Sequence, residues 1–255
     1  MKEKLLSYYN VRQKNKIDMI VIHAAAQKSI NELVDVLEER EVSAHYVVGV
    51  DGEVVKLVDE KNRAWHAGVG VWNGEHDINS YSIGIELCNG LFGEEKYPKV
   101  QMEALKELCL DIMNRYDIKP YNVIGHADMA PNRKIDPGSM FDWKYMAKNG
   151  IGIWYDLKTF EVIKPNRVEE ALNCIGYGTE DVVMTEWAFL RHYNPKLYRF
   201  LGGKKGANEC MIDGVVPHNN PEFLRTLGAV YRAYNNYENV NVAEIGFKKT
   251  VGCRF

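Results

Sequence analysis

The chain has 255 residues, a formal net charge of −3 and a hydrophobic content of 46%, which is enough to bury a sizeable core. The small negative charge provides no basic surface for nucleic acid, so the composition argues against a DNA or RNA partner. No apolar run approaches the ~18 residues that a membrane-spanning helix needs, and the N-terminal ten residues lack the apolar core of a signal peptide.

The five cysteines are an odd number and are scattered without the spacing of metal or redox motifs. Cys109 falls on the apolar side of a predicted helix and is expected in the core. Free thiols together with the missing signal favour a reducing, cytoplasmic compartment, and the periplasm or cell envelope is the alternative. No feature of the sequence indicates an oligomeric state.

The first predicted elements are a strand and a helix. Residues 19–23 form a short apolar run closed by a polar residue, which predicts a buried strand. Residues 29–40 begin with Ser29 three positions before Glu32, the capping-box pattern of a helix N-terminus.

A hairpin and a long loop are predicted next. Residues 46–50 and 53–58 flank an Asp-Gly pair at 51–52, a pattern that predicts two strands joined by a type I′ turn. Residues 63–80 are rich in Gly, Asn, Trp and His and predict a long loop. Loops of that length in a compact domain usually carry function.

Further along, residues 83–87 and 122–126 predict buried strands, and apolar residues at helical spacing predict a core-facing helix over 99–116. Val100 is expected on the buried face of that helix. Strands that alternate with helices and include a hairpin predict an α/β fold with a mixed sheet flanked by helices.

The residue pattern along the chain changes after residue 143, and the first domain is expected to span residues 1–156. Residues 157–167 are predicted as a linker, residues 168–235 as a small all-α helical domain, and residues 236–255, which lack periodicity, as a tail.

Three polar residues are placed near the ends of predicted strands, where ligands bind in open α/β sheets. His23 and His126 each end an apolar run, and Asp136 lies on a turn-rich loop ten residues after His126. Two imidazoles and one carboxylate leave a fourth tetrahedral position open, the pattern of catalytic rather than structural zinc. The alternative is that each histidine is a packed residue and that the three lie far apart.

Five segments resemble the motifs of one enzyme family, in that family's order. The segment GHADMAPNRKIDPG at 125–138 resembles the zinc-ligand signature of the N-acetylmuramoyl-L-alanine amidases, which are related to phage amidase-type lysozymes and to animal peptidoglycan recognition proteins. The other segments are VIH at 21–23, SAHY at 43–46, AWHAG at 64–68 and SIGIEL at 82–87.

The resemblance implies that His23, His126 and Asp136 hold one Zn²⁺ per chain. It also assigns Glu86 as the general base and Lys134 as the electrophilic partner. An amide is a poor electrophile, so the site must supply hydroxide, and zinc lowers the pKa of its bound water to about 7. A base near that water takes the remaining proton and hands it to the leaving amine. A cation stabilises the developing oxyanion.

Each of the two catalytic assignments has an alternative. Glu86 would otherwise be a solvent-facing carboxylate at a sheet edge, although its apolar neighbours favour a buried strand. Lys134 would otherwise be a solvated surface lysine.

His45, Trp65 and His66 are candidate substrate-binding residues. His66 lies beside Trp65 in the predicted long loop and fits a surface that faces sugar or peptide. His45 and His66 are alternatively partners of the metal ligands, or simply packed. Many relatives have a Thr two residues after the first ligand, whereas this chain has alanines at 24–26, which concerns substrate contact rather than metal binding.

The predicted helical domain resembles the small three-helix peptidoglycan-binding module found behind amidases of this type. The alternative is a helical cap that stabilises the catalytic domain, because aromatic stripes are more often core than ligand platform.

The resemblance implies a zinc-dependent hydrolase that cleaves the amide between N-acetylmuramic acid and the L-alanine of the stem peptide, in peptidoglycan or muropeptides, and so acts in cell-wall degradation and turnover. One alternative is a peptidoglycan-binding or sensing protein without turnover, which Glu86 and Asp136 argue against, because non-catalytic relatives typically lose a ligand. A structural zinc site is disfavoured by the open fourth position.

Overall fold

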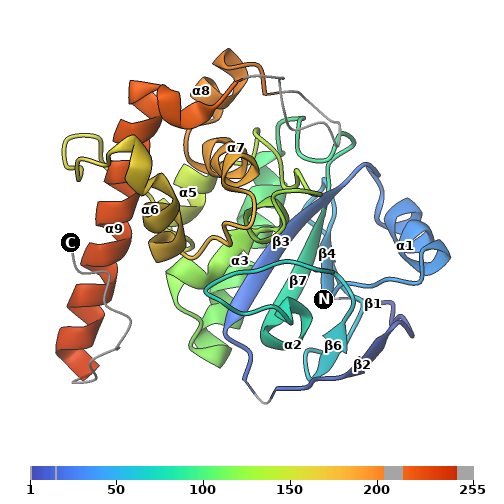
Figure 1. Cartoon of the computed structure of the whole chain (residues 1–255). Coiled ribbons are helices and arrows are strands. Elements are labelled where there is room, and N and C mark those ends of the chain that lie inside the picture. Colours follow the sequence, from blue (N-terminus) through green and yellow to red (C-terminus); the bar gives the residue numbers. More distant parts are fainter. Residues whose placement is uncertain (1, 15, 204–214, 246–255) are drawn as a thin grey trace.

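The computed structural model describes residues 2–14, 16–203 and 215–245. Its centre is a six-stranded mixed sheet in the order β1-β5-β4-β7-β3-β8, accompanied by the two-stranded sheet β2-β6 (Figure 1). The strands are β1 Lys2–Glu3, β2 Tyr9–Val11, β3 Met19–Ala25, β4 Tyr46–Val48, β5 Val54–Lys56, β6 Asn62–Ala64, β7 Ser82–Cys88 and β8 Val123–Gly125. The mixed α/β architecture predicted from the sequence is confirmed.

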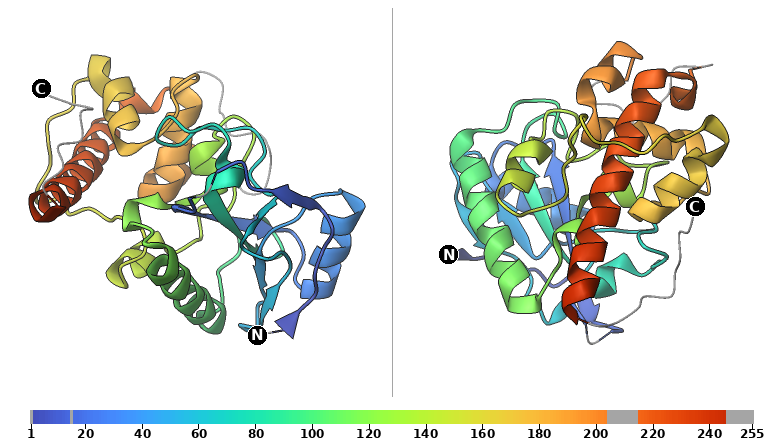
Figure 2. Two further views of the ribbon diagram at one scale, coloured as in Figure 1. Left: turned by 90° about the horizontal axis from the view of Figure 1, so that it is seen from below. Right: turned by 90° about the vertical axis from the view of Figure 1, so that its left-hand side faces the viewer.

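The helices that follow or interrupt these strands are α1 Ile30–Glu39, α2 Ile78–Tyr81, α3 Lys99–Tyr116, α4 His126–Met129, α5 Trp143–Lys148, α6 Val168–Ile175, α7 Val182–Tyr193, α8 Pro195–Phe200 and α9 Pro221–Ile245. Short 3₁₀ turns occupy Pro120–Asn122, Pro165–Arg167 and Pro217–Asn219. Figure 2 shows α1 and the C-terminal helices at opposite ends of the sheet. Among the described helices, none combines the length and the apolar character that a membrane crossing requires.

Strand β3 lies between β7 and β8 and is parallel to both. Because side chains alternate across a strand, Ile20 and Ile22 pack with α3, whereas Met19 and Val21 pack with the C-terminal helices. His23 has the parity of Val21 and therefore lies on the face toward the C-terminal helices.

The predicted hairpin forms, but its turn differs from the prediction. Strands β4 and β5 pair antiparallel, and the Gly49 N–H donates to the Glu53 carbonyl (2.8 Å), which leaves residues 50–52 as the loop. A type I′ turn needs two consecutive residues with positive φ. Gly52 has φ 83°, but Asp51 is not among the positive-φ residues, so the type I′ prediction is wrong.

Helices α1 and α3 begin and end within a residue of their predicted limits. The Glu32 N–H donates to Ser29 Oγ (3.2 Å), as the capping pattern indicated. Val100 was expected in the core and is 52% exposed. Gln101 is buried in its place, and its amide donates to the carbonyls of Val48 and Cys88.

The predicted long loop is shorter than expected, because β6 occupies its start and α2 its end. The predicted tail is wrong in its first part, since α9 continues to Ile245. Apolar side chains of α9 such as Phe223, Leu227 and Val230 are fully buried and anchor it. Residues 246–255 lie outside the described residues.

The cysteines depart from the expectation of free thiols at one position. Cys88 and Cys109 are free and buried, and Cys109 lies in the core as expected. Cys174, in α6, is disulfide-bonded, so the expectation is wrong for this residue. Cys210 and Cys253 lie outside the described residues.

The C-terminal helices and the sheet share one apolar core. Val21 of β3 and Met129 of α4 belong to the same buried cluster as Trp187, Phe189 and Leu227 of the C-terminal helices. The predicted linker contains no helix or strand over residues 157–164, yet it also packs inward: Ile163 is buried and the Glu161 N–H donates to the Gly228 carbonyl (3.1 Å).

Candidate active site

The carboxyl ends of β3, β7 and β8 bring three of the predicted site residues together. His23 of β3 is paired in register with Glu86 of β7. Strand β8 ends at Gly125, and His126 begins α4 directly after it. The Asp136 carbonyl accepts the Ala127 N–H (2.8 Å), so the loop that carries Asp136 is tied back to the start of α4.

Three donor atoms of these residues converge on one point. His23 Nδ1 and His126 Nδ1 are 2.8 Å apart, and Asp136 Oδ2 lies 3.1 Å from the His126 atom and 3.4 Å from the His23 atom. All three side chains are buried. A tetrahedral zinc ion with bonds of ~2.0–2.1 Å requires its ligand atoms to be about 3.3 Å apart. The two distances to Asp136 fit such an ion, whereas the two nitrogens lie closer together than a bound ion would hold them.

The remaining nitrogen of His126 has a fixed partner. His126 Nε2 lies 2.9 Å from the Ala67 carbonyl, which can only accept a hydrogen bond, so Nε2 carries the proton. The Arg133 guanidinium donates to the same carbonyl and to that of Val69, which holds residues 67–69 in place. His126 Nδ1 therefore presents a lone pair to the convergence point.

A hydrogen-bond relay fixes His23 in the same way. The Ser82 hydroxyl donates to the Ile78 carbonyl (2.6 Å) and accepts from His66 Nε2 (3.1 Å). His66 Nδ1 is then the acceptor for His23 Nε2–H (2.9 Å). His23 Nδ1 is left without a proton, so two lone pairs and a carboxylate face one another, an arrangement that a cation stabilises.

The charge states at neutral pH suit metal binding. Burial, reinforced by His126, lowers the pKa of His23 to about 4, so the ring is neutral. Burial opposes the ionisation of Asp136, but positive charge on the adjoining His126 and His23 rings would hold the pKa of that carboxyl well below its usual range. Neutral imidazole and ionised carboxylate are the forms that ligate a metal.

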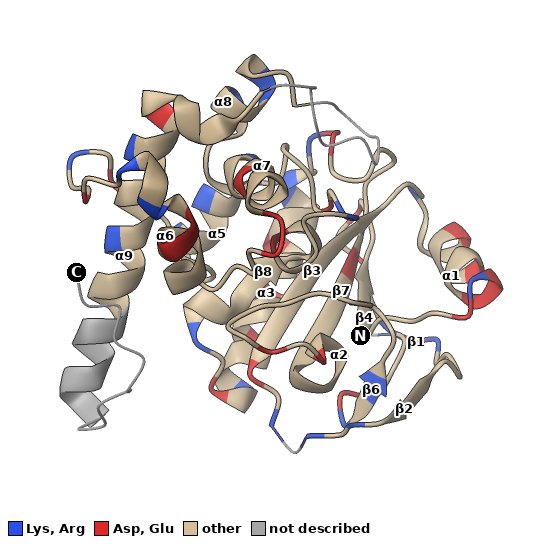
Figure 3. Ribbon diagram, viewed as in Figure 1, with Lys and Arg blue, Asp and Glu red and all other residues tan. Residues whose placement is uncertain are grey.

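A cavity of about 500 Å³ opens beside these donors. Its lining includes most of the predicted site residues: Trp65, His66, Glu86, His126, Lys134 and Asp136. Leu33, Val36 and Leu37 of α1 form an apolar wall. The sequence of β7 contains one charged residue, Glu86, and Figure 3 shows acidic colour on this strand.

Glu86 is electrostatically unusual. Burial, followed by the negative charge of Asp136, raises its pKa to about 8, and the Lys134 ammonium partly offsets this. Lys134 is half-buried and lines the same cavity rather than lying in open solvent. A carboxyl group with a pKa close to neutrality is suited to accept and return a proton.

The structure places the three predicted substrate-binding residues differently. Trp65 and His66 line the cavity, and Trp65 Nε1 donates to Asn10 Oδ1 (3.1 Å). His45 is completely buried: its Nδ1 accepts the Gly84 N–H and its Nε2 contacts the Asn62 carbonyl. Because its ring is enclosed and does not line the cavity, substrate contact is not supported for His45.

Sequence reasoning missed a buried support for the helix that begins with His126. Asp128 Oδ2 accepts the Gly125 N–H (2.7 Å) and contacts His192 Nδ1 (2.8 Å), and Asp128 Oδ1 accepts the Tyr177 hydroxyl (2.8 Å). Asp128 is present in the 125–138 motif, but its partners come from the C-terminal region, and no sequence signal links them to it.

Comparisons with known proteins agree with this geometry. Residues 13–139 match the family described as N-acetylmuramoyl-L-alanine amidase. The N-acetylmuramoyl-L-alanine amidase AmiD of Escherichia coli is 36% identical over 213 residues, which cover 72% of this chain and 77% of AmiD. The 1,6-anhydro-N-acetylmuramyl-L-alanine amidase AmpD of Haemophilus influenzae is 40% identical over 104 residues, 40% of this chain and 55% of AmpD.

Solved structures extend the similarity to most of the chain. The complex of E. coli AmiD with anhydro-N-acetylmuramic acid-L-Ala-D-γ-Glu-L-Lys superposes with a TM-score of 0.70 and 29% identity, covering 88% of this chain and 91% of that one. AMPDH3 from Pseudomonas aeruginosa has a TM-score of 0.67 and 27% identity, with 91% and 97% covered. Such coverage includes the C-terminal helices. The chain belongs to the N-acetylmuramoyl-L-alanine amidases, enzymes that hydrolyse the amide bond between N-acetylmuramic acid and L-alanine.

Proposed function

We propose that this amidase depends on one zinc ion per chain, held by His23, His126 and Asp136, and that it cleaves muropeptides. The observation that carries the proposal is the convergence of three unprotonated donor atoms on one point at the edge of a cavity. A zinc ion bound there supplies a Lewis acid and a coordinated water of lowered pKa.

Glu86 acts as the proton carrier in this proposal. With a pKa of about 8 in the metal-free site, its carboxylate takes a proton from the attacking water and returns it to the nitrogen of the departing L-alanine. Lys134 lines the same cavity as Glu86. It donates to the oxygen that becomes negative as the amide carbonyl is attacked.

Trp65 and His66 are proposed to contact substrate. Both lie on the cavity wall, and the Trp65 side chain is only half-buried, which leaves part of its ring for a ligand. The AmiD complex contains an anhydro-muropeptide, and the AmpD names specify 1,6-anhydro-N-acetylmuramyl-L-alanine. We therefore propose soluble muropeptides, with ordinary or anhydro sugars, as substrates alongside the peptidoglycan polymer.

The compartment is part of the same proposal. The sequence favoured the cytoplasm because it indicated free thiols, but Cys174 is disulfide-bonded. Disulfides persist in oxidising compartments. We therefore favour the alternative, the periplasm or cell envelope, over the cytoplasm.

Two substitutions test the site together. His126→Ala should remove both the zinc, expected at about one ion per chain, and the cleavage of an N-acetylmuramoyl-peptide followed by mass spectrometry. Glu86→Gln should keep the zinc and lower kcat by ~10²–10⁴-fold, the usual effect of losing a positioned base. His76→Ala, at an exposed histidine, is the control and should change neither. Stoichiometric zinc in the His126→Ala protein would contradict the ligand set.

A further inference from the structure

The loop that carries Asp136 is gripped by a second loop of the catalytic region. Residues 130–142 connect α4 to α5 without a helix or strand, so no regular element fixes Asp136 as β3 fixes His23. The residues that follow Asp136 instead contact residues 89–97, which lie between β7 and α3. We call residues 89–97 the clasp.

The two loops meet backbone to backbone at a pair of glycines. Gly93 and Gly138 have φ values of 86° and 82°, a region that favours glycine. A Cβ atom at Gly93 would collide with the Pro137 carbonyl, and one at Gly138 would collide with the Gly93 carbonyl. The Met140 N–H donates to the same Gly93 carbonyl (3.2 Å). This close approach leaves the Asp136 loop little freedom to shift against the clasp.

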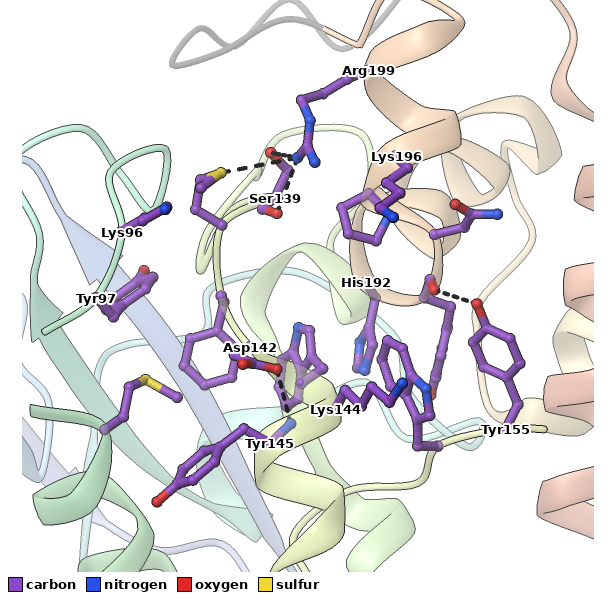
Figure 4. Close-up of a pocket in the computed structure, with 18 of the residues that line it drawn as sticks. Lys96, Tyr97, Ser139, Asp142, Lys144, Tyr145, Tyr155, His192, Lys196 and Arg199 are labelled. Atoms are coloured by element: carbon purple, nitrogen blue, oxygen red, sulfur yellow. Dashed lines mark hydrogen bonds between the residues drawn. The ribbon is translucent and has the colours of Figure 1, made fainter. Parts of the chain in front are cut away.

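One buried carboxylate of the clasp binds the Asp136 loop directly. Glu94 Oε1 accepts the Ser139 N–H (3.0 Å), and Glu94 Oε2 accepts the Ser139 hydroxyl (2.8 Å). Glu94 and Ser139 are only 5% and 4% exposed. Figure 4 shows Arg199 reaching from α8 towards Ser139, and its Nη1 lies 3.2 Å from Ser139 Oγ. Hydrogen bonds to a carboxylate are stronger than those to neutral acceptors, so Glu94 fixes Ser139 firmly.

Further contacts hold the clasp in shape and tie it to the same loop. Asn89 comes directly after β7, and its Oδ1 accepts the Gly93 N–H (2.8 Å) and the Glu95 N–H (3.3 Å). Its Nδ2 donates to the Glu95 carbonyl (3.0 Å). At the end of the clasp, the Tyr97 hydroxyl donates to the Pro137 carbonyl (2.7 Å). The clasp is thus internally braced and grips the Asp136 loop at more than one point.

These contacts bear on the metal centre through the position of Asp136. The Ala127 N–H donates to the Asp136 carbonyl on one side, and the clasp holds residues 137–140 on the other. The Asp136 carboxylate is thereby placed with Oδ2 3.1 Å from His126 Nδ1. A metal ligand must be held within about 0.5 Å of its productive position. The residues that fix this loop therefore affect how well the site binds its ion.

We propose that Glu94 is a positioning residue for Asp136. By holding Ser139, three residues further along the loop, the Glu94 carboxylate sets where the Asp136 carboxylate lies relative to His23 and His126. The inference rests on the proposed function, because it takes Asp136 to be a zinc ligand. Glu94 does not line the active-site cavity, so it acts on the metal centre through the loop and not by contact with substrate.

The test compares Glu94→Ala with Glu186→Ala, a matched control. Glu186, in α7, is also buried, and its carboxylate likewise engages one residue twice: it accepts the His218 N–H (3.3 Å) and contacts His218 Nδ1 (2.6 Å). Both variants should have a lower Tm than wild type, because each removes the acceptor of two hydrogen bonds. Only Glu94→Ala should also bind zinc more weakly, by about tenfold, in a competitive titration with a chelator. Equal zinc affinity in the two variants would overturn the proposal.

Two further variants make the result specific. Glu94→Gln retains an oxygen for the Ser139 N–H and an amide that can donate to the Ser139 hydroxyl, so it should recover most of the zinc affinity. Ser139→Ala removes the hydroxyl alone, with little change to the core, and should weaken zinc binding about threefold. A Glu94→Gln protein as weak as Glu94→Ala, or a Ser139→Ala protein with wild-type affinity, would contradict the route through Ser139.

Wild-type protein is titrated in the same way, which separates this inference from the proposed function. Wild type that binds no zinc would overturn the proposed function and the role of Glu94 with it. Tight zinc binding by wild type and by Glu94→Ala alike would overturn the role of Glu94 alone.

Discussion

At the scale of single residues, Glu86 couples its ionisation to the stability of the fold. Burial and then Asp136 raise its pKa to about 8, above the usual value of 4.5. Between about pH 4.5 and 8, the metal-free folded protein therefore keeps a proton on Glu86 that the unfolded chain has already released. The free energy of unfolding falls as the pH rises through that window. His23 has the opposite effect, because its lowered pKa destabilises the fold as the pH falls below about 6.5.

A comparison with Glu86→Gln isolates the effect of this carboxyl group. Chelator-treated wild type and Glu86→Gln should have similar Tm values near about pH 5, and the variant should melt several degrees higher near about pH 8. His23 is present in both proteins, so its contribution cancels. Thermal melts at several pH values provide the measurement. Parallel Tm profiles for the two proteins would show that Glu86 does not have a raised pKa.

The sequence predicted which polar side chains would lie close together where parallel strands carry them to one edge of the sheet. His23 lies near the end of β3, His126 directly follows β8, and the loop of Asp136 is tied back to the start of α4, so the topology of parallel strands brings the three to one edge of the sheet. His45 also belongs to a motif, but the motif does not reveal that the Gly84 N–H and the Asn62 carbonyl enclose its ring. Burial of a polar side chain depends on long-range packing, which local sequence does not encode.

At the scale of elements, the one-turn helix α4 depends on contacts from the C-terminal region. This helix begins with His126. Within it, the Asp128 carboxylate accepts the Gly125 N–H and the Tyr177 hydroxyl and contacts His192 Nδ1. A helix this short is not stable by itself, so its position is set by its partners. We expect these partners to hold His126 in the orientation that metal binding requires.

Tyr177→Phe tests this support, and Tyr155→Phe is its matched control. Both changes remove a tyrosine hydroxyl that donates across the boundary between the first 156 residues and the C-terminal helices, from Tyr177 to Asp128 in the first case and from Tyr155 to the Tyr193 carbonyl in the second. Each should cost about 1 kcal/mol of stability. Tyr177→Phe should in addition weaken zinc binding about tenfold, as loss of a supporting contact near a metal site does. The measurement is competitive zinc titration, and equal zinc affinity in the two variants would restrict Tyr177 to a structural role.

The element predictions were accurate where periodicity was strong and failed where tertiary contacts decide. Helix α3 was predicted over its full length, because apolar residues recur along it at helical spacing. Strand β6 was missed, because Asn62 and Arg63 do not resemble a strand and form one by pairing with β2. The extension of α9 past residue 236 was missed for a similar reason: the sequence there shows no clear periodicity, and buried residues earlier in the helix anchor it.

At the scale of the whole molecule, the C-terminal helices are part of the enzyme's core. Trp187 and Phe189 are fully buried in the cluster that also contains Met19 and Ile124 of the sheet. The sequence left two roles open for this region, a binding module and a stabilising cap. The shared core favours the stabilising cap.

Removal of the C-terminal helices therefore should not leave an intact catalytic domain. A chain ending at residue 167 exposes Val21, Ile124 and Met129 to water and strips Asp128 of His192 and Tyr177. Exposing a buried side chain of this size costs ~1.5–3 kcal/mol, and the total stability of a domain is only ~5–15 kcal/mol. We expect the truncated protein to have a Tm more than ~10 °C lower and to lose turnover on small muropeptides as well as on sacculi. A truncated protein that melts like wild type and cleaves small muropeptides at the same rate would show two independent domains instead.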